Sequence, residues 1–170
     1  MTIRKILTEP DKILRKKSLK VENVDKDIQQ LMDDMLETMY AAPGIGLAAI
    51  QVGVPKRVIV LDLARKDEPR NPMYFVNPEI IEKSDNLSIY EEGCLSVPGQ
   101  FAEVSRPARC YVKYLDYYGQ PKEIKAEGVL ATCIQHEMDH LEGILFIDYL
   151  SKLKKTMIVK KLSKQKKEIE

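Results

Sequence analysis

Two histidines four residues apart, His136 and His140, enclose a glutamate, Glu137. In an α-helix, residues four apart lie on the same face, so both imidazoles can bind one metal ion. Glu137 lies about 100° around the helix axis from His136, so its carboxylate can stay outside the ligand set and still contact a water molecule on the ion. The pattern therefore predicts a helix with one face turned to a metal site, and it indicates hydrolytic chemistry with Glu137 as general base.

A catalytic metal site needs a third protein ligand and an open position for water. Metzincin peptidases place a third histidine six residues after the second, where this chain has Phe146. Thermolysin-like peptidases use a downstream glutamate, but Glu142 is too close in the same helix, and Glu168 and Glu170 lie in the tail. Neither pattern is completed, which argues against the alternative function of a metallopeptidase that cleaves internal peptide bonds.

The three cysteines are the remaining candidates for the third ligand. Cys133 precedes His136 by three residues, a turn too far to join both imidazoles around one ion. Cys110 lies in an expected strand and is interpreted as a small buried apolar group. Cys94 lies in a loop-like segment with glycines on both sides, which can bring a thiolate and nearby backbone N–H groups to a metal. We therefore expect Cys94 to complete the ligand set.

Composition limits the class of protein. A length of 170 residues fits one domain spanning 1–170, and 44% hydrophobic with 31% charged residues is an ordinary globular balance. A net charge of +1 gives no strong overall field for nucleic acid, so no specific DNA partner is expected. The chain has no apolar stretch of membrane-spanning length, its N-terminal region has no export signal, and three cysteines cannot all pair. We therefore expect a cytoplasmic protein with no membrane partner.

Hydrophobic periodicity predicts three helices and four strands. The helices are expected at 25–40, 127–141 and from 151 onward, and the strands at 57–64, 73–81 (interrupted by Pro78), 110–117 and 121–126. The first helix, with Asn23 or Asp25 as its N-cap, is expected to bury an apolar stripe. That stripe is Ile28, Leu31, Met32, Met35, Leu36 and Met39. Because helices and strands do not alternate regularly, an α+β fold is favoured over a doubly wound sheet.

The last 20 residues form a basic segment. Residues 151–170 contain eight lysines and two glutamates, a net charge of +6, so the remaining residues sum to −5. Leu150, Leu153 and Met157 are expected to face the body of the protein while the lysines face solvent. Lysines without aromatic partners favour contact with phosphate groups over reading of bases.

Three segments together resemble the peptide deformylase family. They are Gly-Ile-Gly-Leu-Ala-Ala-Ile-Gln at 44–51, Glu-Gly-Cys-Leu-Ser at 92–96, and Gln-His-Glu-Met-Asp-His-Leu-Glu-Gly at 135–143. Any one of them alone is weak, but the joint match in this order is highly specific and extends over nearly the whole chain. The resemblance is to the bacterial type with a C-terminal helix. It implies an α+β fold in which mixed, mostly antiparallel sheets pack around a central metal-binding helix.

The resemblance also implies a function. The implied reaction removes the formyl group from N-formylmethionine at the start of nascent polypeptides and releases formate. One divalent ion would be bound, Fe²⁺ in the cell with Zn²⁺ or Ni²⁺ able to replace it. Its ligands would be Cys94, His136 and His140. Glu137 would act as general base and then acid, and the side chain of Gln51 and the backbone N–H of Leu95 would stabilise the oxyanion. The basic C-terminal helix would dock on the ribosome.

A substrate pocket is expected beside the ion. Val129, Thr132 and Cys133 precede His136 by seven, four and three residues and share its helix face. They are expected to line the space for the methionine side chain, although a core role is equally expected for Thr132 and Cys133. The other walls are expected to include Ile45, Gly46, Tyr90 and Gly93. Glu92 and Arg106 are expected to form a supporting ion pair, and Phe101 stands where some family members have an arginine near the pocket mouth.

Overall fold

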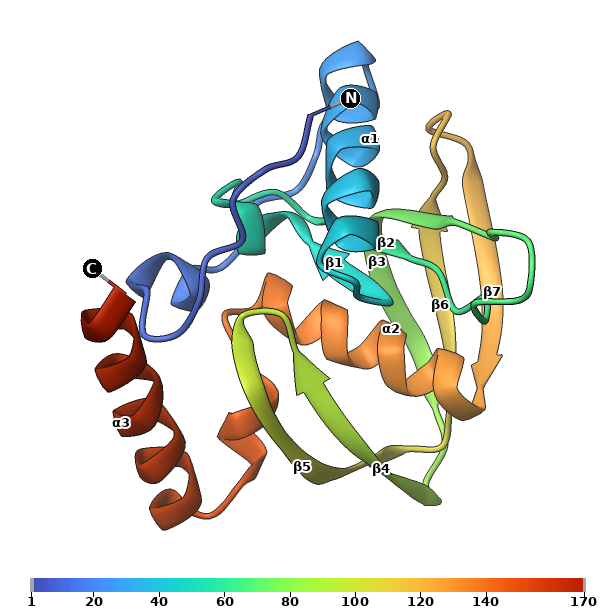
Figure 1. Ribbon diagram of the computed structural model, residues 1–170. Coiled ribbons are helices and arrows are strands. Elements are labelled where there is room, and N and C mark those ends of the chain that lie inside the picture. The colour runs from blue at the N-terminus through green and yellow to red at the C-terminus, as the bar shows by residue number, and fades with distance from the viewer. Residues whose placement is uncertain (1, 170) are drawn as a thin grey trace.

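In the computed structural model, which describes residues 2–169, three α-helices accompany two antiparallel sheets (Figure 1). The helices are α1 (Lys26–Ala41), α2 (Gly128–Leu141) and α3 (Lys152–Ile169). The larger sheet has the strand order β1-β2-β3-β6-β7, from β1 (Gly46–Ala48), β2 (Val58–Leu61), β3 (Met73–Lys83), β6 (Arg109–Leu115) and β7 (Pro121–Glu127). The smaller sheet is the hairpin of β4 (Leu87–Cys94) and β5 (Val97–Pro107).

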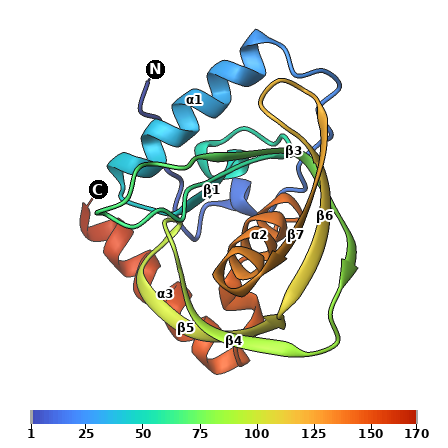
Figure 2. The same ribbon diagram turned by 90° about the vertical axis from the view of Figure 1, so that its right-hand side faces the viewer.

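Helix α2 lies between the two sheets. Figure 2 looks roughly along this helix and shows strands on several sides of it, with the β4–β5 hairpin below and the larger sheet above and to the right. Short 3-10 helices, η1 (Lys12–Arg15), η2 (Ala49–Val52) and η3 (Phe146–Tyr149), connect these layers. The expected α+β fold with a central helix is confirmed. Among residues 2–169, no helix combines the length and apolar character that crossing a membrane requires.

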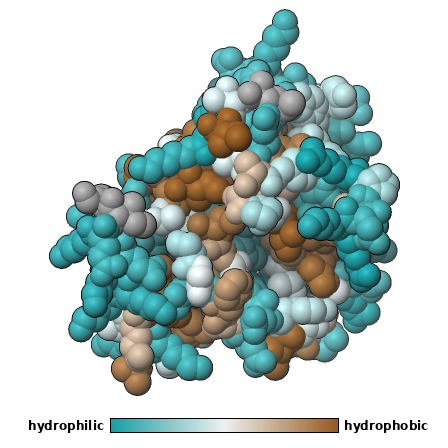
Figure 3. Space-filling model, in the orientation of Figure 1, coloured by the Kyte–Doolittle hydropathy of each residue, from teal (hydrophilic) through white to brown (hydrophobic). Residues whose placement is uncertain are grey.

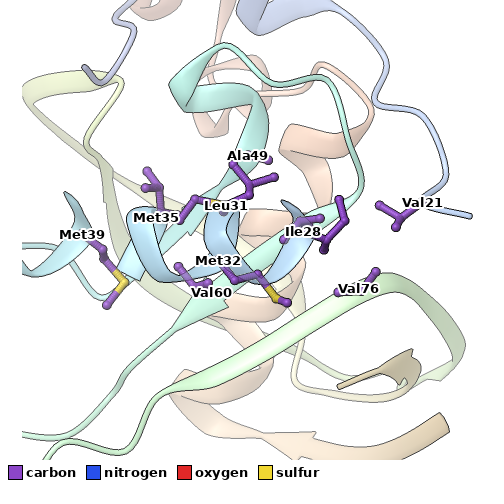
Figure 4. Packing of buried hydrophobic residues seen from close by; sticks show 11 residues of the cluster. Val21, Ile28, Leu31, Met32, Met35, Met39, Ala49, Val60 and Val76 are labelled. Atoms are coloured by element: carbon purple, nitrogen blue, oxygen red, sulfur yellow. The ribbon is translucent and has the colours of Figure 1, made fainter. Parts of the chain in front are cut away.

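Helix α1 buries its apolar stripe against β1 and β2, as predicted from its spacing. Ile28, Leu31, Met32, Met35 and Met39 are buried, and Figure 4 shows them in one cluster with Ala49, Val60 and Val76. Leu36 is only partly buried at the margin of this cluster.

The N-terminus of α1 is capped by Asp25, one of the two expected residues. Its carboxylate accepts a hydrogen bond from the backbone N–H of Ile28 at 3.0 Å. Replacing Asp25 with alanine is expected to lower the free energy of unfolding by about 1 kcal/mol, because that N–H loses its partner. Urea unfolding measures the change, with Asp67→Ala in an exposed loop as the control. Equal stabilities of the two variants would contradict the capping role.

Helix α2 ends where the chain needs a left-handed residue. Gly143 has φ +76°, and a Cβ there would overlap the backbone carbonyl of Arg15. Only glycine fits both conditions without strain. The close approach brings the N-terminal segment around Arg15 against the C-terminal end of α2.

The prediction that Cys94 lies in a loop was wrong. Cys94 is the last residue of strand β4, and a two-residue turn of Leu95 and Ser96 leads directly into β5. The hairpin was missed because most side chains of β4 are exposed or only partly buried. A strand with so little buried surface lacks the clear hydrophobic alternation on which sequence-based detection depends.

The four predicted strands are present with changed ends. Strand β2 stops at Leu61, because the side chain of Asp62 accepts hydrogen bonds from the N–H groups of Ala64 and Asn71 and turns the chain. Strand β3 continues to Lys83 beyond Pro78, and its pairing with β6 shifts register between Val76 and Glu79. The proline therefore produces an irregularity rather than a strand end.

Helix α3 packs through a different face from the one predicted. Leu150 is partly buried, but Leu153 and Met157 are 71% and 62% exposed, so their expected contact with the body was wrong. The packed residues are Ile158, Val159 and Leu162, which contact a cluster containing Val97, Val104 and Phe146. Ile158, Val159 and Leu162 follow the spacing of one helical face, and burial of this apolar face sets the side of α3 that packs. The Nζ of Lys155 lies 2.7 Å from the Oδ1 of Asp148.

Candidate metal centre

Helix α2 and strand β4 bring three metal-ligating side chains together. His136 and His140 lie on one face of α2, and Cys94 approaches from the end of β4. The ligand atoms of the three residues all lie within 4.8 Å of one another, and the Sγ of Cys94 is 3.4 Å from the Nε2 of His140. A thiolate with two imidazole nitrogens is a donor set that suits zinc and ferrous iron. The residues expected as ligands are thus placed around one point.

Glu92 fixes which nitrogen of His136 faces this point. Its Oε1 lies 2.9 Å from the Nδ1 of His136. Burial favours a neutral Glu92, but the hydrogen bonds with His136 and Arg106 outweigh it and lower the pKa of the carboxyl. An ionised carboxylate can only accept, so Nδ1 carries the hydrogen, and in the neutral ring that binds a metal ion the lone pair is on Nε2.

The site favours positive charge at the His136 ring. Burial alone lowers the pKa of His136, but the hydrogen bonds with Cys94 and Glu92 and the charge of Glu137 outweigh it and raise the pKa to about 10. His140 differs, because burial and the charge of His136 lower its pKa well below the usual value. A pocket that attracts a cation between a thiol and two imidazoles fits a divalent ion.

Arg106 holds Glu92 in place and links it to Asp139. Its guanidinium donates to both carboxylate oxygens of Glu92, at 2.7 and 2.9 Å, so the expected ion pair is confirmed. A third N–H donates to Asp139 at 2.7 Å, and the hydroxyl of Tyr149 donates to the same oxygen. Asp139 lies within the predicted metal motif, yet neither it nor Tyr149 was singled out from the sequence. The only feature of the sequence that could have identified Asp139 is its place directly before His140. No pattern in the sequence pointed to Tyr149.

Glu137 lies beside the three donors without joining them. Its Oε1 is 3.6 Å from the Nε2 of His136 and 3.9 Å from the Nε2 of His140. Its Oε2 is buried and has no hydrogen-bond partner among residues 2–169. Burial raises the pKa of Glu137 to about 7, so this carboxyl can exchange a proton near neutral pH.

Gly46 makes room for this carboxyl. A Cβ at position 46 would lie 3.1 Å from the Cδ of Glu137 and 2.8 Å from a methyl carbon of Leu61. The expected pocket residue is therefore in contact with Glu137. Its neighbour Ile45 is 52% exposed and lies at the surface of the same segment.

Gln51 and Leu95 flank Cys94. Gln51 is 1% exposed, and its Nε2 donates to the Sγ of Cys94 at 3.4 Å and to the Oγ of Ser96 at 3.0 Å. Its Oε1 accepts the backbone N–H of Ala48 at 2.9 Å. Leu95 follows Cys94 in the turn, where its side chain lies against Gly44. Ser96 was not identified from the sequence, although it belongs to the recognised Glu-Gly-Cys-Leu-Ser segment.

The other predicted pocket residues are more dispersed. Thr132 is 7% exposed, and Val129, in the first turn of α2, is 49% exposed. Burial, followed by the charges of Glu137 and Glu92, raises the pKa of Cys133 to about 12, so this residue stays a neutral thiol close to the site. Tyr90 and Gly93 lie on β4, where the ring of Phe101 on β5 packs against Gly93. The pocket roles of these residues remain predictions.

Comparison with known proteins supports the resemblance. The family model for polypeptide deformylase matches residues 3–156. The chain is 67% identical over 166 residues to the peptide deformylase of Pelagibacter ubique, covering 98% of this chain and 96% of that protein. It is 62% identical over 167 residues to that of Phenylobacterium zucineum, covering 98% and 99%.

Solved structures agree with the sequence comparison. The crystal structure of peptide deformylase from Ehrlichia chaffeensis has a TM-score of 0.92 at 44% identity and covers 97% of each chain. The structure from the same organism in complex with actinonin has a TM-score of 0.93 at 47% identity, covering 97% and 98%. These matches confirm the resemblance drawn from the three motifs, and the chain belongs to the polypeptide deformylase family.

Proposed function

We propose that this protein removes the formyl group from the N-terminal formylmethionine of nascent polypeptides and releases formate. One observation carries the proposal: Cys94, His136 and His140 meet around a single point with the buried Glu137 beside them. The chain is a metal-dependent hydrolase, as its family is, and a relative that binds actinonin supports a peptide-sized site. A substrate that emerges from the ribosome places the reaction in the cytoplasm.

The proposed mechanism assigns a task to each residue. Cys94, His136 and His140 would hold the ion, which when bound would supply Lewis-acid activation of water and of the formyl carbonyl. Glu137 takes a proton from the attacking water and then gives a proton to the leaving amine. The Nε2–H of Gln51 and the backbone N–H of Leu95 donate to the formyl oxygen as negative charge develops there. Loss of one such donor costs on the order of 100- to 1,000-fold in rate.

The methionine side chain is proposed to occupy the apolar space beside this centre. Its walls would come from the residues already expected, which are Ile45, Gly46, Tyr90, Gly93, Val129, Thr132 and Cys133. Ile45 and Val129 are partly exposed, and Val129 lies in the first turn of α2. Their exposure favours an opening of the pocket to solvent near them.

The function is tested by formate release from formyl-Met-Ala-Ser, with and without a chelator. Release that stops with the chelator and resumes with Fe²⁺ is expected. The acetylated peptide is the control, because the formyl carbon bears only hydrogen and fits a tighter site. No formate release from the metal-loaded protein would refute the proposal, and cleavage between the residues of the peptide would favour a metallopeptidase.

The identity of the ion is a further part of the proposal. A donor set of one thiolate and two imidazoles suits both zinc and ferrous iron, and we propose Fe²⁺ in the cell, with Zn²⁺ or Ni²⁺ able to replace it. Metal analysis after anaerobic purification, with the rate of formate release per bound ion, distinguishes the three.

Replacing Cys94 with serine is expected to weaken Zn²⁺ binding by at least about tenfold, because a soft ligand becomes a hard one. Competition with a chromogenic chelator measures the affinity. Cys110→Ala is the matched control, since the buried Cys110 lies outside the three-donor group. Unchanged metal content and activity in Cys94→Ser would remove Cys94 from the site.

The C-terminal helix is proposed to dock on the ribosome through phosphate groups of its RNA. Figure 3 shows a largely hydrophilic surface over α3, and Lys160, Lys161 and Lys164 are exposed. Replacing these three with glutamine is expected to weaken co-sedimentation with ribosomes at low salt and to reduce its salt dependence, because three phosphate contacts are lost. The buried Leu162 stays in place, so the fold is kept. Sedimentation equal to that of a Lys66→Gln control would contradict docking through this helix.

A further inference from the structure

The turn between β4 and β5 contains a buried serine for which the proposed mechanism has no task. Ser96 is 0% exposed, and its hydroxyl oxygen accepts a hydrogen bond from the Nε2 of Gln51 at 3.0 Å. The carboxamide of Gln51 is therefore held from outside the metal site. Its second contact is with the backbone N–H of Ala48, which donates to Oε1 at 2.9 Å.

These two contacts determine which end of the Gln51 amide faces the metal site. A carboxamide presents one acceptor oxygen and two N–H donors, and a half turn about its last bond exchanges them. The N–H of Ala48 can only donate, so it selects the oxygen. The hydroxyl oxygen of Ser96 takes one of the two N–H hydrogens, and the other points toward the Sγ of Cys94, 3.4 Å from Nε2. That remaining N–H therefore lies on the side of the three metal donors.

Backbone hydrogen bonds fix the positions of Gln51 and Ser96 relative to each other. The N–H of Leu7 donates to the carbonyl of Gln51 at 2.7 Å, and the N–H of Glu9 donates to the carbonyl of Ser96 at 2.8 Å. The N-terminal segment thus bridges η2 and the hairpin turn. With both backbones fixed, the side-chain hydrogen bond between Gln51 and Ser96 has little freedom to lengthen.

We propose that Ser96 is a positioning residue for deformylation, acting through Gln51. Its hydroxyl oxygen holds the carboxamide so that the second N–H, which contacts the Sγ of Cys94 in this structure, is available to the negative charge that develops on the formyl oxygen. The inference rests on the proposed function, and in particular on the role of Gln51. An interaction made with developing charge contributes in the transition state and little in the ground state, so its loss lowers kcat with little change in KM.

The test is a double-mutant cycle with rates expressed per bound metal ion. Ser96→Ala is expected to lower kcat about tenfold, less than the loss from removing a whole donor, with KM and metal content within about twofold of the parent. In a Gln51→Ala background, Ser96→Ala is expected to cause no further loss, because the group that it positions is gone. Ser18→Ala is the matched control, since Ser18 is also buried and its hydroxyl has no hydrogen-bond partner among residues 2–169.

Ser96→Thr keeps the hydroxyl oxygen and serves as the second variant if alanine disturbs the turn. Its kcat is expected to stay within about threefold of the parent, and a loss as large as that of Ser96→Ala would overturn the inference. Equal losses from Ser96→Ala with and without Gln51 would also overturn it, because a purely structural serine predicts that result. If Gln51→Ala itself leaves kcat unchanged, the proposed role of Gln51 fails; if Gln51→Ala is slow and Ser96→Ala is not, only the inference fails.

Discussion

Replacement of Glu137 by glutamine should lower the rate of formate release by about 100- to 10,000-fold while the metal ion stays bound. Glutamine has nearly the volume of glutamate and keeps a hydrogen-bonding end, but its carboxamide cannot accept the proton of the attacking water. Burial raises the pKa of Glu137 to about 7, so the native carboxyl can take up and return a proton at cellular pH. The variant loses this transfer and none of the three metal donors.

Glu142→Gln provides the control for this prediction. Glu142 is the C-cap residue of the same helix, and its carboxylate pairs with Arg57 at 2.6 Å outside the metal site. Turnover and metal content are measured on both proteins. Near-normal turnover by a metal-loaded Glu137→Gln protein would show that another group is the base. Loss of the ion would show that Glu137 is a ligand.

The metal-binding helix could be predicted because its chemistry depends on local spacing. The positions of His136, Glu137 and His140 follow from the 3.6-residue helical period, and the structure shows them as expected on α2. The position of Cys94 could not be predicted from local spacing. It was expected as a ligand by exclusion of other residues, whereas its actual position depends on the pairing of β4 with β5, which no local pattern encodes.

The supporting residues were hardest to predict, since each acts through a contact distant in sequence. Ser96 reaches Gln51 across 45 positions, and Arg106 reaches Asp139 across 33. The pairing of Arg106 with Glu92 was expected only through the family resemblance, and its contact with Asp139 was not expected. A buried serine or arginine by itself carries no sign in the sequence of which partner it will meet. The packed face of α3 was missed for a similar reason, because Ile158, Val159 and Leu162 meet a cluster with Val97 and Val104 that lies far away in the sequence.

The network behind His136 explains why so many charges are tolerated in the interior. Glu92 is 6% exposed and Arg106 is 4% exposed, so neither is stabilised by water. Each of them is stable as an ion only because the other is present, with Asp139 as a second carboxylate on the guanidinium. The orientation of His136 therefore depends on Arg106, with which it shares Glu92 as a partner.

Arg106→Met is accordingly expected to lower the free energy of unfolding by about 3–5 kcal/mol, because removal of one partner leaves buried charges without compensation. The guanidinium is among the causes that lower the pKa of Glu92, so its loss favours a protonated carboxyl, which accepts the Nδ1–H of His136 less strongly than a carboxylate does. Affinity for the ion should fall by roughly 10- to 100-fold, as for the loss of other groups that orient a ligand. Denaturant unfolding of the metal-free protein and chelator competition measure the two effects separately.

Neutral partners distinguish loss of charge balance from loss of packing. A triple variant with Arg106→Met, Glu92→Gln and Asp139→Asn is expected to recover most of the lost stability, because no uncompensated ion remains. It should not recover metal affinity, since a carboxamide oxygen accepts the hydrogen of His136 less strongly than a carboxylate does. Arg65→Met, at a side chain that is 86% exposed, should change stability by no more than about 0.5 kcal/mol. A triple variant as unstable as Arg106→Met would mean that the arginine contributes through the packing of its stem, and that the carboxylates do not need its charge.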